Sequence, residues 1–118
     1  MAWTLDDVKE RFGEDVLRDI CRDVNDLMCG RAGHGHHPNR IGVPERLWRK
    51  LLAHGGYTEV GIEKALRQEK LLQSDTCGPF TPYTITTLGG IITDEGGPLS
   101  AAELDELITC ALSYRQLI

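Results

Sequence analysis

The stretch GGYTEVGI, residues 55–62, joins two segments whose apolar residues have helical spacing. Two glycines end the first segment, because glycine adopts the positive φ angle of a tight turn and weakens a helix interior. Thr58 stands at the expected N-cap of the second segment, where its hydroxyl oxygen can accept a hydrogen bond from a free backbone N–H. Ile62 lies one turn into that segment, where it can pack on the first. The stretch therefore predicts two helices joined by a tight turn.

The helix before this turn is predicted to begin at Pro44, because the missing N–H of proline costs nothing at the first position of a helix. It ends at the two glycines. The helix after the turn is predicted to begin at Thr58 and to continue to about residue 70. The apolar residues that give the two helices their spacing are Leu47, Trp48, Leu51, Leu52, Ile62, Ala65 and Leu66.

Helices are also predicted at both ends of the chain. Thr4 caps a helix that ends near Gly13, and a second helix with an apolar stripe ends at Gly30. Near the C-terminus, Ser100 and Glu103 have the spacing of a capping box. The face opposite the stripe of the second helix is expected to be solvated surface and carries Asp15, Asp19, Arg22, Asp23 and Asp26.

After residue 70 the pattern changes from helical to extended. The β-branched and aromatic stretch YTITT, residues 83–87, predicts a strand. Leu71-Leu72 would form the strand before it, and Asp75–Pro82 the loop between the two. A short extended piece is also expected at Arg40–Val43. The fold class predicted is mainly α with a small β-hairpin.

The order of these elements resembles the winged-helix family. The turn at Gly56, Tyr57, Thr58 and Ile62 is similar to the Gly-apolar-Ser/Thr-x-x-x-Ile/Val turn of DNA-binding helix-turn-helix units. The stretch YTITTLG, residues 83–89, resembles the Tyr-x-Leu-Thr-x-x-Gly strand that returns from the wing, with Ile in place of Leu. The resemblance covers about residues 40–90. It departs from the family at KL, residues 70–71, where a glycine often stands between the recognition helix and the strand. It implies a winged-helix-like fold with extra N- and C-terminal helices, and transcription regulation through DNA.

The length of 118 residues suits one domain. Within it, residues 1–29 would form the N-terminal helices, residues 44–90 the helix-turn-helix with its wing, and residues 100–117 the C-terminal helix. No apolar run approaches the ~20 residues that span a bilayer. The acidic N-terminus is not a secretory signal, so a cytoplasmic location without membrane contact is expected. The four cysteines are widely spread, which favours free thiols in a reducing compartment.

Regulators that the chain resembles often dimerise through added terminal helices. A homodimer is therefore expected, and an intramolecular core is the alternative use of the same residues. The candidates for such a dimer interface are Trp3, Phe12, Leu112, Leu117 and Ile118.

The net charge of −5 conceals a strong segregation. Residues 1–28 contain eight acids and four bases, whereas residues 29–54 contain one acid, five bases and all four histidines. A basic block between acidic flanks can be an anion-binding face. It can equally neutralise the acidic flanks within the fold, and the sequence leaves both readings open.

The hypothesis of DNA binding assigns roles to two groups of residues. Arg31, Arg40, Arg46, Arg49 and Lys50 would contact phosphates, because Lys and Arg supply much of the affinity for DNA. Thr58, Lys64 and Arg67 would lie on the recognition helix. Glu59 and Glu63, at the start of that helix, count against DNA. The alternative is a module that binds an acidic protein surface, as a small phage-type inhibitor of a host nucleic-acid enzyme would.

The loop GRAGHGHHPNR, residues 30–40, raises the question of a metal. Zinc is bound by Cys and His, usually from close pairs, but no Cys-x-x-Cys is present. We therefore expect no cofactor and interpret the loop as a mobile basic segment at the binding face. Enzyme signatures are also missing, which favours a non-enzymatic protein. The residues of a third interpretation, a small zinc-binding protein, are Cys29, His34, His36 and His37, with Cys21 two helical turns before Cys29.

Overall fold

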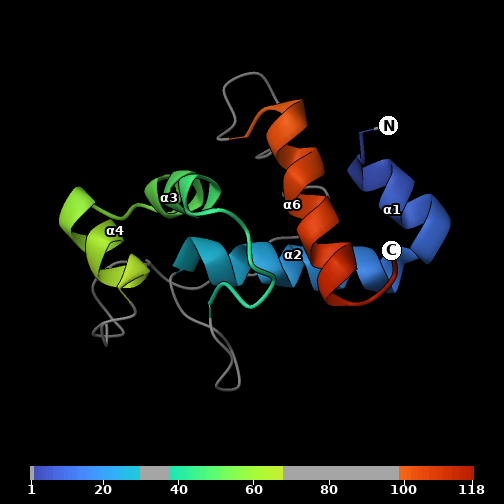
Figure 1. The fold of residues 1–118 in the computed structure, drawn as a ribbon, viewed down its shortest axis with the longest axis horizontal. Helices are drawn as coiled ribbons and strands as arrows, with labels where there is room; N and C mark the ends of the chain where they lie inside the picture. The colour runs from blue at the N-terminus through green and yellow to red at the C-terminus, as the bar shows by residue number, and fades with distance from the viewer. Residues whose placement is uncertain (1, 30–37, 68–98) are drawn as a thin grey trace.

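A computed structural model describes residues 2–29, 38–67 and 99–118, and these contain five helices. Helix α2 lies at the centre (Figure 1), and α1, α3 and α6 each pack against it. Helix α4 packs on α3. The bounds are α1 Leu5–Phe12, α2 Glu14–Cys29, α3 Glu45–His54, α4 Glu59–Leu66 and α6 Ala101–Tyr114.

Three predicted helix starts are confirmed by side-chain caps. Thr4 Oγ1 accepts a hydrogen bond from Asp7 N at 3.1 Å, and Ser100 Oγ accepts one from Glu103 N at 3.2 Å. In both caps the carboxylate of the same acid accepts a hydrogen bond from the N-cap backbone N–H, so each is a capping box. Thr58 Oγ1 accepts from Gly61 N at 3.2 Å. Removing such a cap typically costs about 1 kcal/mol.

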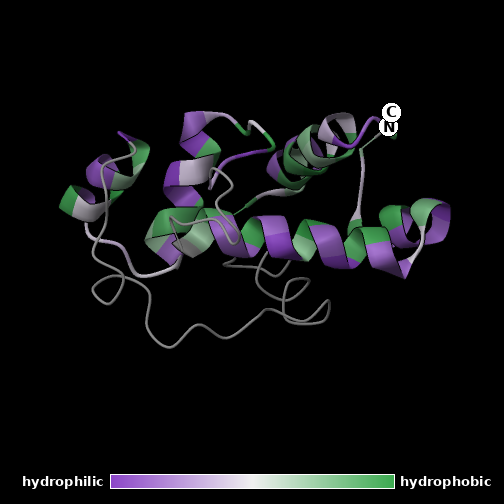
Figure 2. Ribbon diagram, turned by 90° about the horizontal axis from the view of Figure 1, so that it is seen from below, coloured by the Kyte–Doolittle hydropathy of each residue, from purple (hydrophilic) through white to green (hydrophobic). Residues whose placement is uncertain are grey.

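The core forms where the apolar stripe of α2 meets α3 and α6. Ribbons coloured by hydropathy show polar and apolar residues alternating around these helices, as expected when only one face is buried (Figure 2). Full burial of each leucine or isoleucine stabilises the fold by roughly 1.5–3 kcal/mol. The large side chains with almost no exposed surface are Leu17, Ile20, Leu27, Met28, Leu47, Leu51, Leu52, Leu107, Ile108 and Leu112.

Helix α3 also closes over the C-terminal end of α2. The indole Nε1 of Trp48 donates a buried hydrogen bond of 3.0 Å to Leu27 O, one of the last carbonyls of α2. At the other end of α3, Gly55 lies so close to α2 that a Cβ atom there would overlap the carbonyl oxygen of Met28. The first glycine of the turn is thus required by close approach of two backbones.

The turn between α3 and α4 has the geometry predicted from the sequence. Gly56 has a φ of 99°, in the region that favours glycine. Tyr57 is buried, and its N–H donates to Leu52 O at 3.1 Å. Ile62 is buried as expected. Pro44 lies at the N-cap of α3, one position earlier than predicted.

The predicted fold class, mainly α with a small β-hairpin, is wrong in its β part. The residues that the structure describes are helical or irregular and contain no strand. The expected strands and wing, residues 71–89, lie outside the described ranges. Arg40–Val43 was expected to be extended, but residues 38–41 form a turn. The Asn39 side chain bonds both Val43 N and Val43 O, at 2.9 and 3.0 Å, in place of a strand partner.

Two further expectations need correction. Asp23 and Asp26 are buried, although the charged face of α2 was expected to be solvated. Leu112, a candidate for the dimer interface, is fully buried in the core of the chain itself. Trp3 and Phe12 are partly buried against that core, with their ring centroids 5.9 Å apart.

Within the described segments, no helix is long and apolar enough to cross a membrane.

Candidate partner-binding face

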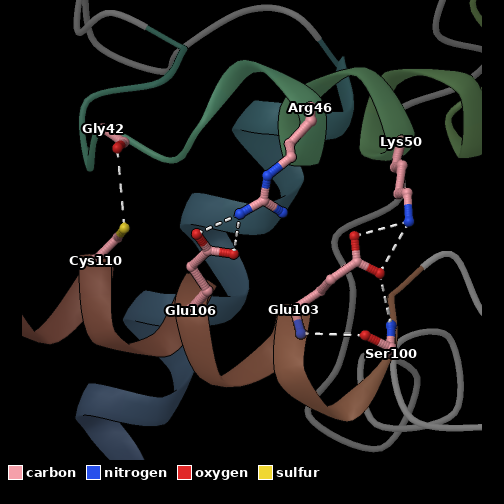
Figure 3. Close-up of polar contacts among 7 residues, drawn as sticks. All are labelled: Gly42, Arg46, Lys50, Ser100, Glu103, Glu106 and Cys110. Atoms are coloured by element: carbon pink, nitrogen blue, oxygen red, sulfur yellow. Dashed lines mark hydrogen bonds and ion pairs between the residues drawn. The ribbon is translucent and has the colours of Figure 1, made fainter.

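Three of the predicted phosphate contacts lie on α3, and each faces a carboxylate of the same chain. Arg46 Nη2 donates to both carboxylate oxygens of Glu106, at 2.5 and 2.6 Å. Lys50 Nζ lies 2.9 and 2.7 Å from the two oxygens of Glu103. Both acids belong to α6, so the pairs link α3 to α6 (Figure 3). We call these two ion pairs the α3–α6 seam.

The seam follows from the spacing of its residues. Arg46 and Lys50 are four apart on α3, and Glu103 and Glu106 are three apart on α6, so each pair of side chains projects from one helix face. The two helices run in opposite directions along the seam, because Lys50 meets Glu103 and Arg46 meets Glu106. Cys110 Sγ continues the series with a weak contact of 3.9 Å to Gly42 O.

Arg49 holds α3 against α4. Its Nη1 lies 2.6 Å from Glu63 of α4, and its Nη2 donates to Glu45 of α3 at 3.1 Å. The hydrogen bond from Arg49, followed by its charge, lowers the pKa of Glu63. The hydrogen bond from Lys50, followed by that from the Ser100 backbone, lowers the pKa of Glu103. All these groups remain partly exposed, so salt screens their attraction.

Arg40 belongs to a different environment. Its Nε and Nη2 donate to Oδ1 of Asp23, at 2.9 and 2.5 Å, and Arg115 Nη2 lies 2.6 Å from Oδ2 of the same carboxylate. Oδ2 accepts no well-aligned hydrogen bond, so charge attraction holds the second contact. The Asp23 side chain is 1% exposed. We call these three residues the Asp23 cluster.

The charges of the Asp23 cluster are balanced by a second acid. Burial lowers the pKa of Arg40, but the hydrogen bond to Asp23 and the charges of Asp23 and Asp26 raise it by more. Sequence reasoning placed Arg40 among the phosphate contacts and missed Asp23 and Arg115. One signal was present: Asp23 stands three residues after Ile20 and four before Leu27, at the edge of the apolar stripe.

The predicted recognition-helix residues lie on α4 and at its start. The Thr58 hydroxyl is used by the helix cap, Lys64 is exposed on α4, and Arg67 is exposed at the C-cap that follows it. Val60 is 66% exposed on the same outward face. Glu59 and Glu63 are also exposed there, so this face carries both signs of charge.

Other apolar side chains are exposed where α6 ends. Tyr114 is 52% exposed, and Leu117 and Ile118 follow it with 38% and 52%. Arg115, between them, is held in the Asp23 cluster. Two of the expected dimer-interface residues, Leu117 and Ile118, are therefore accessible on the surface.

The remaining predicted ligands lie mostly outside the described ranges. Arg31, His34, His36 and His37 fall in residues 30–37, and Cys29 is described only as the last residue of α2. Among the side chains that are described, no group of three or more His, Cys, Asp or Glu could hold a metal. Burial raises the pKa of the Cys21 thiol to about 11, which disfavours the thiolate that zinc requires.

Comparison with protein-family models, with curated proteins and with solved structures finds no match for this chain.

Proposed function

We propose that this chain is a non-enzymatic regulatory module of the cytoplasm that binds another protein. The observation that carries the proposal is the pairing of Arg46, Arg49 and Lys50 with carboxylates of the same chain. To bind these three bases, a DNA phosphate would have to displace the carboxylates or share the bases with them.

The local charge balance supports this choice. Four acids surround the three bases of α3, so the region has a small net negative charge: Glu45, Glu63, Glu103 and Glu106. Non-specific DNA binding depends on a surplus of positive charge that releases counterions. A surface neutralised in this way gives little of that energy.

Exposed apolar side chains offer a more suitable contact for a protein. Interfaces are enriched in aromatic residues, and a few buried anchors supply most of the binding energy. Tyr114, Leu117 and Ile118 together provide such anchors, whereas Val60 is a single exposed residue of a kind common on any surface. We therefore propose Tyr114, Leu117 and Ile118 as the contact with a different protein.

The test combines capture with directed variants. A tagged wild-type chain and the variant Tyr114→Asp with Leu117→Asp are incubated with native lysate, with and without nuclease. We expect one protein to be retained by the wild type after nuclease treatment and lost from the variant. Val60→Asp, on α4, is the matched control and should retain the same protein. Retention that disappears with nuclease, or that survives the double substitution, would contradict the proposal.

DNA-linked regulation is a second candidate, favoured by the geometry of the α3–α4 turn. Gly56 with its positive φ, the Thr58 cap and buried Ile62 match the helix-turn-helix pattern. This candidate predicts that Arg46→Ala with Arg49→Ala weakens DNA binding without lowering the melting temperature much. Unchanged affinity in that variant would count against it.

A further inference from the structure

The Asp23 cluster joins three separate segments of the chain. Asp23 lies in α2, Arg40 precedes α3, and Arg115 follows α6. Each oxygen of the carboxylate meets a different arginine, and Arg115 Nη1 also donates to Ala111 O at 3.1 Å. The arginine side chains are only 21% and 16% exposed. One buried carboxylate thus contacts both segments that pack on this part of α2.

Stability alone does not explain such a cluster. Burying charges costs a large desolvation energy, which their attraction repays only with good geometry. Apolar residues of similar volume are often as stabilising or more so. What charged groups add is selectivity, because each needs a partner at one position, whereas apolar side chains pack in several arrangements.

The apolar face of α6 could pack in more than one register. Its buried residues repeat at steps of three and four, so a slip of one turn places apolar on apolar: Leu104 onto Ile108, Leu107 onto Ala111 and Ile108 onto Leu112. The same slip moves Arg115 about 6 Å along the helix axis and away from Asp23. It also breaks the α3–α6 seam, but those exposed pairs oppose the slip only weakly.

We propose that the Asp23 cluster fixes the register of α6 along α2 and the position of residues 38–44 beside it. Its role is to exclude the slipped arrangement of a leucine-rich helix. The inference concerns folding specificity and does not depend on the proposed partner.

The test replaces the whole cluster by apolar residues, as Asp23→Leu, Arg40→Met and Arg115→Met in one chain. The three charges of the cluster are then removed together, although the buried Asp26 loses the attraction of Arg40. We expect a helical protein whose melting temperature is no more than about 5 °C below that of the wild type. In methyl NMR spectra, each methyl group of Leu104, Leu107 and Ile108 should give more than one resonance, with contacts to α2 from both registers.

A matched control removes one exposed pair, as Arg46→Met with Glu106→Leu, and should keep one resonance for each methyl group. A triple variant with a single set of resonances and the native α2–α6 contacts would overturn the inference. So would a triple variant that is unfolded, because the cluster would then act as a stabilising element and not as a determinant of register.

Discussion

The Asp23 cluster and the α3–α6 seam use the same kinds of charged groups in opposite surroundings. In the cluster, a carboxylate with 1% exposure is contacted by two arginines from distant segments. In the seam, Arg46 and Lys50 remain 58% and 49% exposed while they contact Glu106 and Glu103. Removing a partner from the cluster leaves charge in the interior, whereas removing Glu103 or Glu106 from the seam leaves a base that is about half exposed to water.

This difference explains how one basic block serves two structural purposes. Arg40 attaches the turn before α3 to α2, and its loss would disturb the core. Arg46, Arg49 and Lys50 neutralise acids at the surface and can exchange partners with salt. Burial, rather than residue type, decides which of these four charges can exchange partners with salt.

The largest effect is expected from Asp23→Asn. The substitution removes the charge that Arg40 and Arg115 share, and breaking a buried pair in this way costs about 3 kcal/mol or more. Urea denaturation measures the loss. Asp15→Asn is the control, because the Asp15 side chain on the same helix is fully exposed at 100%; its effect should stay within about 0.5 kcal/mol. Equal losses in the two variants would remove the distinction between buried and exposed pairs.

A smaller effect, this time a gain in stability, is expected at the C-terminal end of α6, next to Arg115 of the Asp23 cluster. Gln116 has a φ of 59°, where glycine is favoured. Gln116 N and Leu117 N donate to Ser113 O and Leu112 O, both at 3.0 Å, in the pattern of a Schellman motif. Gln116→Gly should therefore stabilise the chain by about 0.5–1 kcal/mol. Ser113→Gly, inside α6, should destabilise it by a similar amount, and loss of stability in both variants would show that this helix end is not strained.

The seam should give a still smaller effect. Glu103→Gln with Glu106→Gln preserves side-chain volume, and glutamine can replace glutamate in the Ser100 capping box. We expect the melting temperature to fall far less than in Asp23→Asn, and the difference from the wild type to disappear at high salt. Thermal unfolding at two salt concentrations measures both. A large loss that persists in high salt would place the seam with the buried cluster.

The pH dependence of the exposed pairs should be the weakest signal. The pKa values of Glu63 and Glu103 are lowered from 4.5 in the folded chain by Arg49 and Lys50. Their pairs therefore add stability that is fully present above about pH 4.5 and is lost as the pH falls through the lowered folded values. The stability difference between the wild type and Glu63→Gln should be constant near neutral pH and shrink in acid. A stability difference that grows as the pH falls would contradict the predicted direction.

Local signals in the sequence predicted much of the helical fold. Thr4, Thr58 and Ser100 each accept from a backbone N–H three residues away, so their caps could be found without tertiary information. Ile41 and Val43 misled the prediction, because both are buried, Ile41 in the turn at residues 38–41 and Val43 just after it, and neither lies in a strand. Propensity gives no means of separating the two cases.

The candidate site was less predictable, because charge pairing depends on tertiary contacts. Nothing in the spacing of Arg46 and Lys50 distinguishes a phosphate contact from a partner for Glu106 and Glu103, which are more than fifty residues away. Asp23 has the charge of a surface residue but lies at the edge of the apolar stripe. Its two arginines come from segments whose approach to α2 no local pattern specifies.

The central proposal is that Arg46, Arg49 and Lys50 serve the fold and not a nucleic acid. Titration of labelled duplex DNA with the wild-type chain, followed by fluorescence anisotropy at low and at moderate salt, tests it most directly. We predict no saturable binding at either salt concentration. Saturable binding at low salt that weakens steeply as salt rises, and that is lost in Arg46→Ala with Arg49→Ala, would contradict the account.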